Sequence, residues 1–336
     1  MKRKVNKVKY LEVIIDLFLL FINMNILITG ITGHIGCALA KTLSLSNKVY
    51  GTYNKKISST LKKELSKKNI TIISLNLLNQ KKIEKFIRIK KINCCIHAAA
   101  VSHEIYVKEN MQNTLDINCN TVFNFLEIQK SIKFKFMLIS TGSVFQDIGK
   151  LKKIPESITP SPISLYAGSK RLGEILVDSY RKYFNSNSCI VRLSWVYGPP
   201  IITNELNIQR GPIPNILYQI IKNKKILFIL NSGKNFKASF TYIDDVTNSI
   251  YKLISMKKFN KSSYHLGSGK NNTLAELFNE IKKKFPKVRF KLGSGAKPWS
   301  NDSIMRPPLA SEYNLKTKIN LKEGLEKYSN WLKENA

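Results

Sequence analysis

Cysteine is scarce in this 336-residue chain, and acidic residues are few. The five cysteines are odd in number and none lies in a C-x-x-C spacing, so the sequence indicates neither a disulfide framework nor a zinc site. We therefore expect no metal and a location in the reducing cytoplasm. Internal repeats and low-complexity tracts are also absent. With a hydrophobic content of 43%, the chain is long enough to form one two-lobed unit or two domains.

The shortage of acidic residues gives the chain an extreme formal charge. Only 22 Asp and Glu residues oppose 55 Lys and Arg residues, for a net charge of +33. Such a charge ordinarily suggests a nucleic acid or an anionic membrane as partner. Here arginine occurs at only eight positions, the lysines are spread over the whole chain, and no RNA-binding motif with interleaved aromatic residues is present. We interpret the charge as a solvated lysine surface and expect no nucleic-acid partner.

No apolar run in the sequence is long enough for a membrane span. Residues 1–23 start with basic residues and continue with an apolar run over 11–22. Glu12 and Asp16 interrupt this run, which is also shorter than the roughly 20 apolar residues that a span needs. Three interpretations of residues 1–23 stay open: an upstream start or dispensable extension, an interfacial anchor, and an export signal. We favour the first, with Met24 as the initiator, and expect no stable membrane insertion.

The segment after Met24 predicts a strand, a tight turn and a helix. Residues 25–29 are apolar and β-branched, the spacing Gly30-x-x-Gly33-x-x-Gly36 follows at once, and a helical pattern of small and apolar residues comes next. Gly30 permits the sharp exit from the strand, Gly33 lets backbone N–H groups approach a pyrophosphate, and Gly36 lets the helix pack closely on the sheet. The start of the helix then faces the phosphates with unpaired donors and its positive dipole end.

A Tyr-x-x-x-Lys spacing stands further along the chain, at Tyr166 and Lys170. Pro160 and Pro162 precede it, and a helical pattern follows. On a helix, this spacing puts the phenol and the ammonium on one face. A nearby ammonium lowers the pKa of a phenol, which is ordinarily about 10. Tyr166 can then take a proton from a carbinol or give one to a carbonyl.

The glycine spacing, the Tyr166-x-x-x-Lys170 motif and the hydroxyl-rich stretch 140–145 together resemble the extended short-chain dehydrogenase/reductase family, which contains nucleotide-sugar epimerases, dehydratases and reductases. The resemblance covers Met24 to the C-terminus. It implies an α/β fold, a Rossmann-type doubly wound parallel sheet with a smaller C-terminal substrate lobe. Residues 24–198 are expected to form the NAD(P)-binding Rossmann domain. Residues 199–336 are expected to form mainly the substrate lobe, with 239–268 returning to the Rossmann core.

The resemblance also implies roles for single residues. Thr141 falls on the position whose hydroxyl hydrogen-bonds the substrate oxygen, and Lys170 would hold the cofactor ribose as well. The expected catalytic residues are Thr141, Tyr166 and Lys170, and the expected substrate-binding residues are Ser143, Arg210 and Arg306. The expected cofactor-binding residues are Gly30, Gly33, His34, Ile35, Gly36, Tyr53, Asn54, Lys55, Asn76, Leu77, Ala98, Ala99, Ala100, Tyr166 and Lys170.

The choice between NAD and NADP depends on the lack of an acidic residue at the end of the predicted second strand. In dinucleotide-binding folds, an acidic residue at the end of the second strand binds the ribose hydroxyls and selects NAD. Here the predicted second strand, residues 48–53, ends in Tyr53 and is followed by Asn54, Lys55 and Lys56. Without a carboxylate to repel a 2′-phosphate, NAD and NADP are both allowed, and the two lysines favour NADP slightly. The alternative is that both lysines are ordinary surface residues.

Four further residues are expected to have structural roles. We interpret His97, at the end of a buried strand, as a structural histidine and not as a general base. Asn118 matches a scaffolding asparagine of the resembled family, and Arg192 matches a position that is structural there. Asp245, in the stretch 240–246, is expected to be the N-cap of a helix.

The lack of an acidic residue after Thr141 limits the type of reaction. Dehydratases and decarboxylases of the resembled family carry an acid just after the threonine, whereas Gly142 and Ser143 follow Thr141 here. We therefore expect hydride transfer at a carbinol or keto carbon of a sugar. This transfer serves either epimerisation through a transient keto-sugar or plain reduction of a 4-keto-sugar, as in dTDP-4-dehydrorhamnose reductases.

The partner of this chemistry is expected to be a small-molecule sugar linked to a nucleotide. Ala238 stands where relatives commonly carry a phosphate-binding arginine, which leaves Arg210 and Arg306 as candidates for that contact. An alternative from a different class is a non-catalytic, NADP-binding regulatory subunit, since a fold does not fix a function. If the chain forms an oligomer, we expect a homodimer.

Overall fold

The computed structural model describes residues 24–54, 57–66, 68–102, 104–147, 151–200, 211–230, 233–234, 236–295 and 317–335. Several predictions therefore lie outside the described residues: those on residues 1–23, Lys55, Lys56, Arg210 and Arg306. None of the helices within the described ranges is long and apolar enough to cross a membrane.

The centre of the molecule is a seven-stranded parallel sheet with the order β11-β6-β5-β4-β1-β2-β3. The strands are β1 (Asn25–Thr29), β2 (Lys48–Tyr53), β3 (Ile70–Ser74), β4 (Cys94–His97), β5 (Lys135–Thr141), β6 (Ser188–Leu193) and β11 (Ser263–Leu266). The strand order reverses beside β1, since β2 and β3 follow on one side and β4, β5 and β6 on the other. The expected Rossmann-type doubly wound sheet is confirmed.

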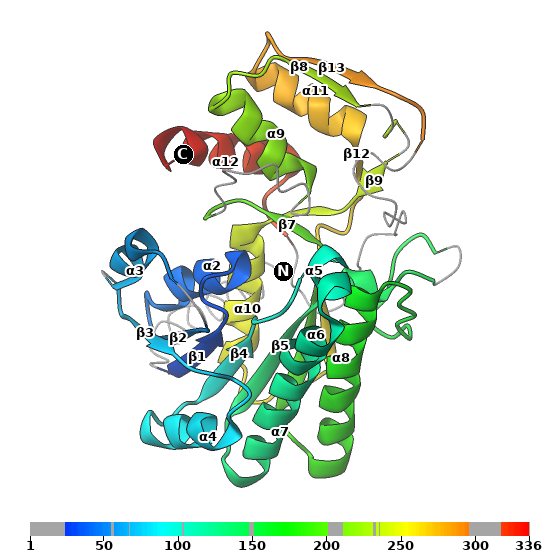
Figure 1. Cartoon of the computed structure of the whole chain (residues 1–336). Coiled ribbons are helices and arrows are strands. Elements are labelled where there is room, and N and C mark those ends of the chain that lie inside the picture. The colour runs from blue at the N-terminus through cyan, green and yellow to red at the C-terminus, as the bar shows by residue number, and fades with distance from the viewer. Residues whose placement is uncertain are drawn as a thin grey trace, which may run out of the picture.

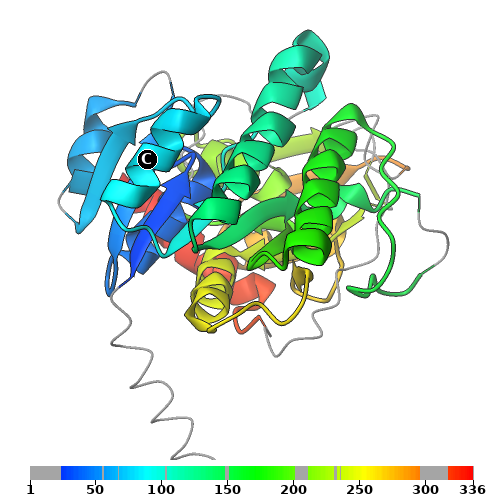
Figure 2. The same cartoon turned by 90° about the horizontal axis from the view of Figure 1, so that it is seen from below.

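Two layers of helices cover the sheet, as Figures 1 and 2 show. On β1, Ile26 and Ile28 pack with residues of α2 (His34–Leu43), α3 (Ser59–Ser66) and α10 (Ile243–Ser255). Leu27, whose side chain points to the other face, packs with residues of α4 (Gln80–Ile89), α7 (Thr121–Ser131) and α8 (Leu165–Phe184). Both faces of the strand are thus buried, as is typical of parallel sheets.

A smaller lobe with its own hydrophobic core lies above the carboxyl ends of the strands in Figure 1. Its helices are α9 (Pro212–Ile221), α11 (Leu274–Lys284) and α12 (Leu321–Asn335). Its short strands form three pairs. These are β8 (Leu227–Leu230) with β13 (Arg289–Leu292), β9 (Lys237–Ala238) with β12 (Asn272–Thr273), and β7 (Trp195–Tyr197) with β10 (Phe240–Tyr242). The chain then runs through α10 to β11, which pairs with β6 in the central sheet.

The prediction that Asp245 caps a helix is wrong. The N-cap of α10 is Tyr242, and Asp245 lies in the first turn of the helix. Its two carboxylate oxygens instead accept the backbone N–H groups of Lys318 and Ile319, at 2.9 and 3.0 Å. The carboxylate therefore ties the segment that leads into α12 to the start of α10. A rule based on local spacing misses partners that lie more than seventy residues away.

Candidate active site

The glycine-rich turn between β1 and α2 contains two glycines that the fold itself requires. Gly30 has a φ of +70°, and a Cβ placed on it would lie 2.8 Å from the Cα of Ala99. A Cβ on Gly36 would collide with the carbonyl oxygen of Gly30. Gly33 is different, because the one atom near a Cβ there is the Gly30 oxygen, at 3.3 Å. Open space beside Gly33 is what a bound phosphate group needs.

The start of α2 is suited to bind an anion. Within the described residues, no side chain caps this end of the helix, and its first turn contains no acidic residue. Backbone N–H groups and the positive dipole end therefore face the space beside Gly33. The turn fits the pyrophosphate of a dinucleotide. His34, which opens the helix, bonds through Nε2 to the Gly198 carbonyl at 3.0 Å and so joins the turn to the loop after β7.

Most of the other predicted cofactor residues lie just after β2, β3 and β4. Tyr53 is half-buried and Asn54 is exposed. The side-chain oxygen of Asn76 accepts the backbone N–H of Leu78 at 2.9 Å, so part of the hydrogen-bonding capacity of this side chain is used in a local turn. The remaining predicted residues are small or apolar: half-buried Ala98, Ala99 and Ala100 follow β4, buried Leu77 follows β3, and half-buried Ile35 lies in the first turn of α2.

His97 has the structural role that the sequence predicts. The ring is fully buried, and its Nδ1 and Nε2 atoms each lie 2.9 Å from a hydroxyl, of Thr29 and Thr121 respectively. Burial, and secondarily the charge of Lys170, lower the pKa of His97 to about 3. The ring is therefore neutral at physiological pH, with one nitrogen donating and the other accepting. It holds β4 to its neighbours and is not a general base.

Tyr166 lies in the first turn of α8, and three side chains hold the start of that helix. Ser164 is the N-cap, and its hydroxyl accepts the N–H of Ala167 at 3.2 Å. The carboxylate of Glu104, on the short helix α5 (Glu104–Glu109), accepts the N–H groups of Leu165 and Tyr166 at 3.2 and 3.0 Å. The carboxamide oxygen of Gln146 accepts two more, from residues 163 and 164, both at 2.8 Å. The backbone that carries Tyr166 is thus held from three segments.

Thr141 ends β5 beside α8, which packs against β5 and the short 3-10 turn η2 (Gly142–Val144). Its hydroxyl oxygen accepts the N–H of Ser143 at 3.0 Å and caps that turn. The hydroxyl hydrogen of Thr141 is therefore left to donate to another group. Ser143 is half-buried within the same turn.

Lys170 is 3% exposed, one helical turn beyond Tyr166 on α8. Burial lowers the pKa of Lys170 to about 8, while Glu174 and Cys119 act in the opposite direction. A buried ammonium with a pKa near neutrality is typical of a functional site.

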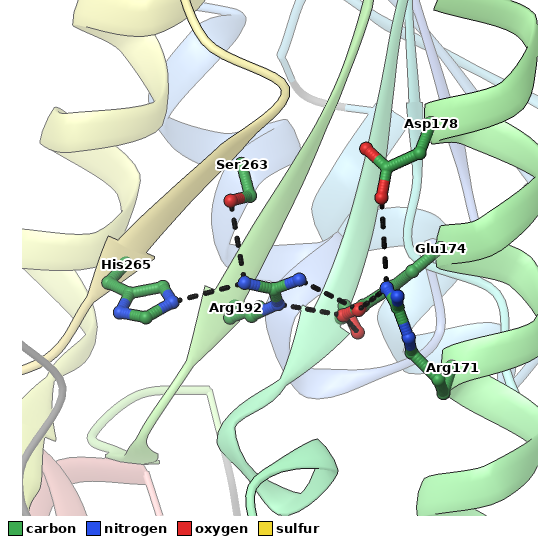
Figure 3. A network of polar contacts seen from close by, with 7 residues as sticks. Arg171, Glu174, Asp178, Arg192, Ser263 and His265 are labelled. Atoms are coloured by element: carbon green, nitrogen blue, oxygen red, sulfur yellow. Dashed lines mark hydrogen bonds and ion pairs between the residues drawn. The ribbon is translucent and has the colours of Figure 1, made fainter. Parts of the chain in front are cut away.

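A buried ion-pair network joins Arg171 and Glu174 of α8 to Arg192 of β6 (Figure 3). Glu174, one further turn along α8, is fully buried and accepts two hydrogen bonds from Arg192, at 3.0 and 2.9 Å. The hydroxyl of Ser140 donates to the same carboxylate at 2.6 Å, and Arg171 adds an ion pair at 3.1 Å. Arg192 also contacts His265, at 3.3 Å. Arg192 is thus a structural residue of the core, as predicted.

Asn118 joins the loop after β4 to α8. Its side chain accepts the N–H of Val101 at 2.9 Å, donates to the Val101 carbonyl at 3.0 Å, and donates to the hydroxyl of Ser169 at 2.9 Å. The scaffolding role predicted for Asn118 is confirmed. Asn118 belongs to a π-helical turn, η1 (Asp116–Asn120), between α6 (Met111–Leu115) and α7.

Three residues with a part in this site, Glu104, Gln146 and Glu174, were not predicted from the sequence. The contacts of Glu104 and Gln146 span many residues and follow no local spacing. Glu174 stands four residues after Lys170, so a search for charged residues on that helical face could have found it. No group of metal-binding side chains occurs among the residues that the structure describes.

Comparison with known proteins places the site in a family context. The family model described as "NAD dependent epimerase/dehydratase family" matches residues 26–267. A UDP-glucuronate 4-epimerase of Thermodesulfobacterium geofontis is 27% identical over 329 residues, which cover 92% of this chain and 96% of that protein.

Solved structures show the same fold. A UDP-N-acetylglucosamine 4-epimerase from Methanobrevibacter ruminantium, in complex with UDP-N-acetylmuramic acid, superposes with a TM-score of 0.81 at 18% identity, covering 94% of this chain and 99% of that one. A UDP-glucuronic acid 4-epimerase from Bacillus cereus, in complex with UDP-glucuronic acid and NAD, gives a TM-score of 0.74 at 22% identity, covering 93% and 100%.

Proposed function

The chain belongs to the NAD dependent epimerase/dehydratase family, and we propose that it is an NAD-dependent 4-epimerase of a nucleotide-linked sugar. The observation that carries this proposal is the buried ammonium of Lys170, one turn beyond Tyr166 on a helix that packs against the Thr141 turn. An ammonium is expensive to bury, so its position needs a functional reason.

In the proposed reaction, Tyr166 is the acid and base. The Lys170 ammonium favours the phenolate form of Tyr166, which accepts the proton of a sugar hydroxyl and later returns it. The hydroxyl of Thr141 donates a hydrogen bond to the same sugar oxygen and orients it. The turn at Gly33 and the Lys170 ammonium would hold NAD, which would supply the acceptor and donor of a hydride at the carbinol carbon, so that return of the hydride to the opposite face of the ketone inverts that carbon.

The residues after Thr141 support epimerisation over dehydration or decarboxylation. Elimination of water needs an acid and a base beside the sugar. Gly142 and Ser143, which follow Thr141, carry no carboxyl group that could take either role. A 4-keto-sugar reductase would use the same three residues but would consume its cofactor. The similar proteins reported above carry the name 4-epimerase, which favours the reaction that recycles the hydride.

We propose NAD as the cofactor, and no comparison supports the slight preference for NADP that we predicted. Solved neighbours from Bacillus anthracis, Bacillus cereus and Thermus thermophilus are complexes with NAD. The described end of β2 carries neither a carboxylate that would repel a 2′-phosphate nor a cation that would attract it. The preference therefore depends on residues beyond Asn54.

The substrate that we propose is a UDP-hexuronate or UDP-hexose, by analogy with the named relatives. The test is incubation of the purified protein with UDP-glucuronate, UDP-glucose or UDP-N-acetylglucosamine. The 4-epimer should form without a stoichiometric supply of cofactor. Consumption of one NADPH per molecule of an added nucleotide-linked 4-keto-sugar would instead identify a keto-sugar reductase, and cofactor binding without turnover of any sugar would favour the regulatory subunit.

We further propose a homodimer that forms through α7 and α8. These adjacent helices expose Phe123, Leu172 and Ile175, each by more than 40%. Large exposed apolar side chains on neighbouring helices are typical of an interface between protein chains. Light scattering after size-exclusion chromatography should give twice the mass of the chain, and Leu172→Glu should convert the dimer to a monomer.

The five cysteines are all buried and free, which supports a reducing compartment.

A further inference from the structure

The small sheet of β8 and β13 covers the core of the smaller lobe with one of its faces. On that face the rings of Phe228 and Phe290 stack with their centroids 5.2 Å apart, and Phe290 stacks in turn on Phe278 of α11. In Figure 1 the two strands lie at the top, beyond α11 and away from the seven-stranded sheet. The sheet is therefore fixed to the lobe by its aromatic face. Because successive side chains of a strand alternate, its other face points outward.

The outward face of this sheet is apolar and basic. It carries Leu227 and Ile229 of β8, and the parallel register puts Arg289 of β13 beside the first and Lys291 beside the second. Leu227 is 51% exposed, Ile229 is 60% exposed, and Ile226, which directly precedes β8, is 57% exposed. Arg289 and Lys291 are exposed as well. These five residues are called the outer patch below.

The segments that carry the outer patch lack negative charge. Residues 206–243 contain no Asp or Glu, and neither do residues 281–301. Exposed lysines stand before β8 and before β13 instead, at positions 222, 224, 225 and 287. The Nζ atom of Lys225 lies 5.0 Å from the centroid of the Phe228 ring, so this charge stays beside the sheet. Lysines occur over the whole chain, but here they surround exposed aliphatic side chains.

The charge distinguishes the outer patch from the exposed apolar face of α7 and α8. On those helices acidic and basic side chains are mixed, since Glu127 pairs with Lys130 and Asp178 pairs with Arg171. A mixed face can meet a second copy of itself. Two copies of a uniformly basic face would repel each other, so the partner of the outer patch has to be negatively charged.

Aliphatic side chains together with positive charge fit an anionic lipid surface. Leucine and isoleucine gain free energy when they enter the boundary between headgroups and acyl chains, and lysine and arginine attract anionic headgroups. A nucleic acid offers the negative charge but no apolar phase. Proteins bind its single-stranded forms largely through aromatic side chains, and the outer patch contains none.

We propose that the outer patch binds the surface of a membrane that contains anionic lipids. The contact is peripheral: Leu227 and Ile229 enter the headgroup boundary, and Arg289 and Lys291 pair with lipid phosphates. The patch lies on the side of the smaller lobe that faces away from the seven-stranded sheet, so this contact leaves the candidate active site uncovered. The inference goes beyond the proposed function and does not depend on it.

The experiment is co-sedimentation of the full-length protein with vesicles of phosphatidylcholine, alone or with about one third phosphatidylglycerol. We expect binding to the anionic vesicles, binding to the neutral vesicles that is weaker by about tenfold or more, and a loss of affinity in high salt. Residues 1–23 are present in every protein compared, so any contribution of theirs is common to all. Failure to bind the anionic vesicles would overturn the inference.

Two double variants test the two components of the outer patch. Leu227→Thr/Ile229→Thr removes the apolar side chains, and Arg289→Gln/Lys291→Gln removes the charges. Each double variant should weaken binding to the anionic vesicles by about tenfold or more. These side chains are exposed, so both variants should keep the thermal midpoint of the unmodified protein.

Matched controls carry the same kinds of substitution far from the smaller lobe. Leu45→Thr/Ile89→Thr changes two exposed apolar residues, and Ile89 is 60% exposed, as is Ile229. Lys82→Gln/Lys85→Gln removes two exposed charges from α4. Both controls should bind the anionic vesicles like the unmodified protein. A variant of the outer patch that binds as tightly as its control would overturn the inference.

The two patch variants also separate a membrane from other partners. If Arg289→Gln/Lys291→Gln weakens binding to the vesicles and Leu227→Thr/Ile229→Thr does not, the patch recognises charge alone, and the inference fails. Tighter binding to a short DNA duplex than to the anionic vesicles would identify a nucleic acid instead. Self-association without lipid that Leu227→Thr/Ile229→Thr abolishes would identify a second copy of the chain, and would likewise overturn the inference.

Discussion

The carboxylate of Glu104 accepts the backbone N–H of Tyr166 at 3.0 Å, although 62 residues separate the two. Glu104 follows the loop after β4, where the predicted cofactor residues Ala98 and Ala99 lie, whereas Tyr166, the proposed acid and base, lies in the first turn of α8. A single side chain thus connects the cofactor side of the site with its catalytic side. Charged acceptors at a helix start form strong hydrogen bonds, so the connection is stiff.

The first prediction concerns this connection. Glu104→Ala should lower turnover by about tenfold, because the start of α8 loses two hydrogen bonds and Tyr166 is held less firmly. The free energy of unfolding should fall by about 1 kcal/mol, as for the loss of a helix cap. Steady-state kinetics and denaturant titration measure the two effects. Glu109→Ala, on the exposed end of the same helix, is the control and should change neither.

The second prediction separates Tyr166 from Lys170. Tyr166→Phe should reduce turnover by a factor on the order of 100 or more, while NAD affinity stays nearly unchanged, because only the acid and base group is lost. Lys170→Ala should reduce turnover and NAD affinity together. Near-normal turnover of Tyr166→Phe would remove this residue from the mechanism.

The third prediction compares two glycines of one turn. Gly36→Ala should destabilise the protein strongly, because its methyl group would collide with the Gly30 carbonyl oxygen. Gly33→Ala should lower the thermal midpoint much less, because its methyl group would lie 3.3 Å from the same oxygen, and should weaken NAD binding, because that methyl group would occupy space that we assign to the pyrophosphate. Equal NAD affinity of Gly33→Ala and the unmodified protein would show that the phosphates lie elsewhere.

The fourth prediction is a loss of stability in acid that depends on His97. The folded pKa of His97 is lowered to about 3, whereas the unfolded chain takes up the proton near its ordinary value of 6.5. Because the unfolded state binds the extra proton, stability is fully present above about pH 6.5 and declines as the pH falls toward 3. Denaturant titrations should show this decline, and in His97→Gln the part of it due to this group should be missing. An identical decline in both proteins would contradict the assignment.

The sequence predicts the architecture well because the strands, turns and helices depend on local patterns. The second strand begins and ends where predicted, at Lys48 and Tyr53, since its apolar and β-branched residues stand between polar turns. The glycine spacing likewise marks the turn before α2 correctly. Patterns of this kind lie within a few residues, where strand and helix geometry decide which side chains meet.

What the sequence does not predict depends on contacts between distant segments. Asp245 looks like a cap, yet its partners are Lys318 and Ile319. Glu104 and Gln146 hold the start of α8 from two other segments, and no spacing rule connects them to Tyr166. Glu174 is an intermediate case, since its distance from Lys170 is visible in the sequence but its burial between Arg171 and Arg192 is not.

The measurement that tests the central claim most directly follows a deuterium label at C4 of UDP-glucuronate or UDP-glucose through the reaction, by NMR. We predict that the 4-epimer forms and retains the label at C4, without added NADPH, and that Tyr166→Phe forms the 4-epimer more slowly by a factor on the order of 100 or more. Loss of the label to solvent, or a dehydrated or decarboxylated product, would contradict the account.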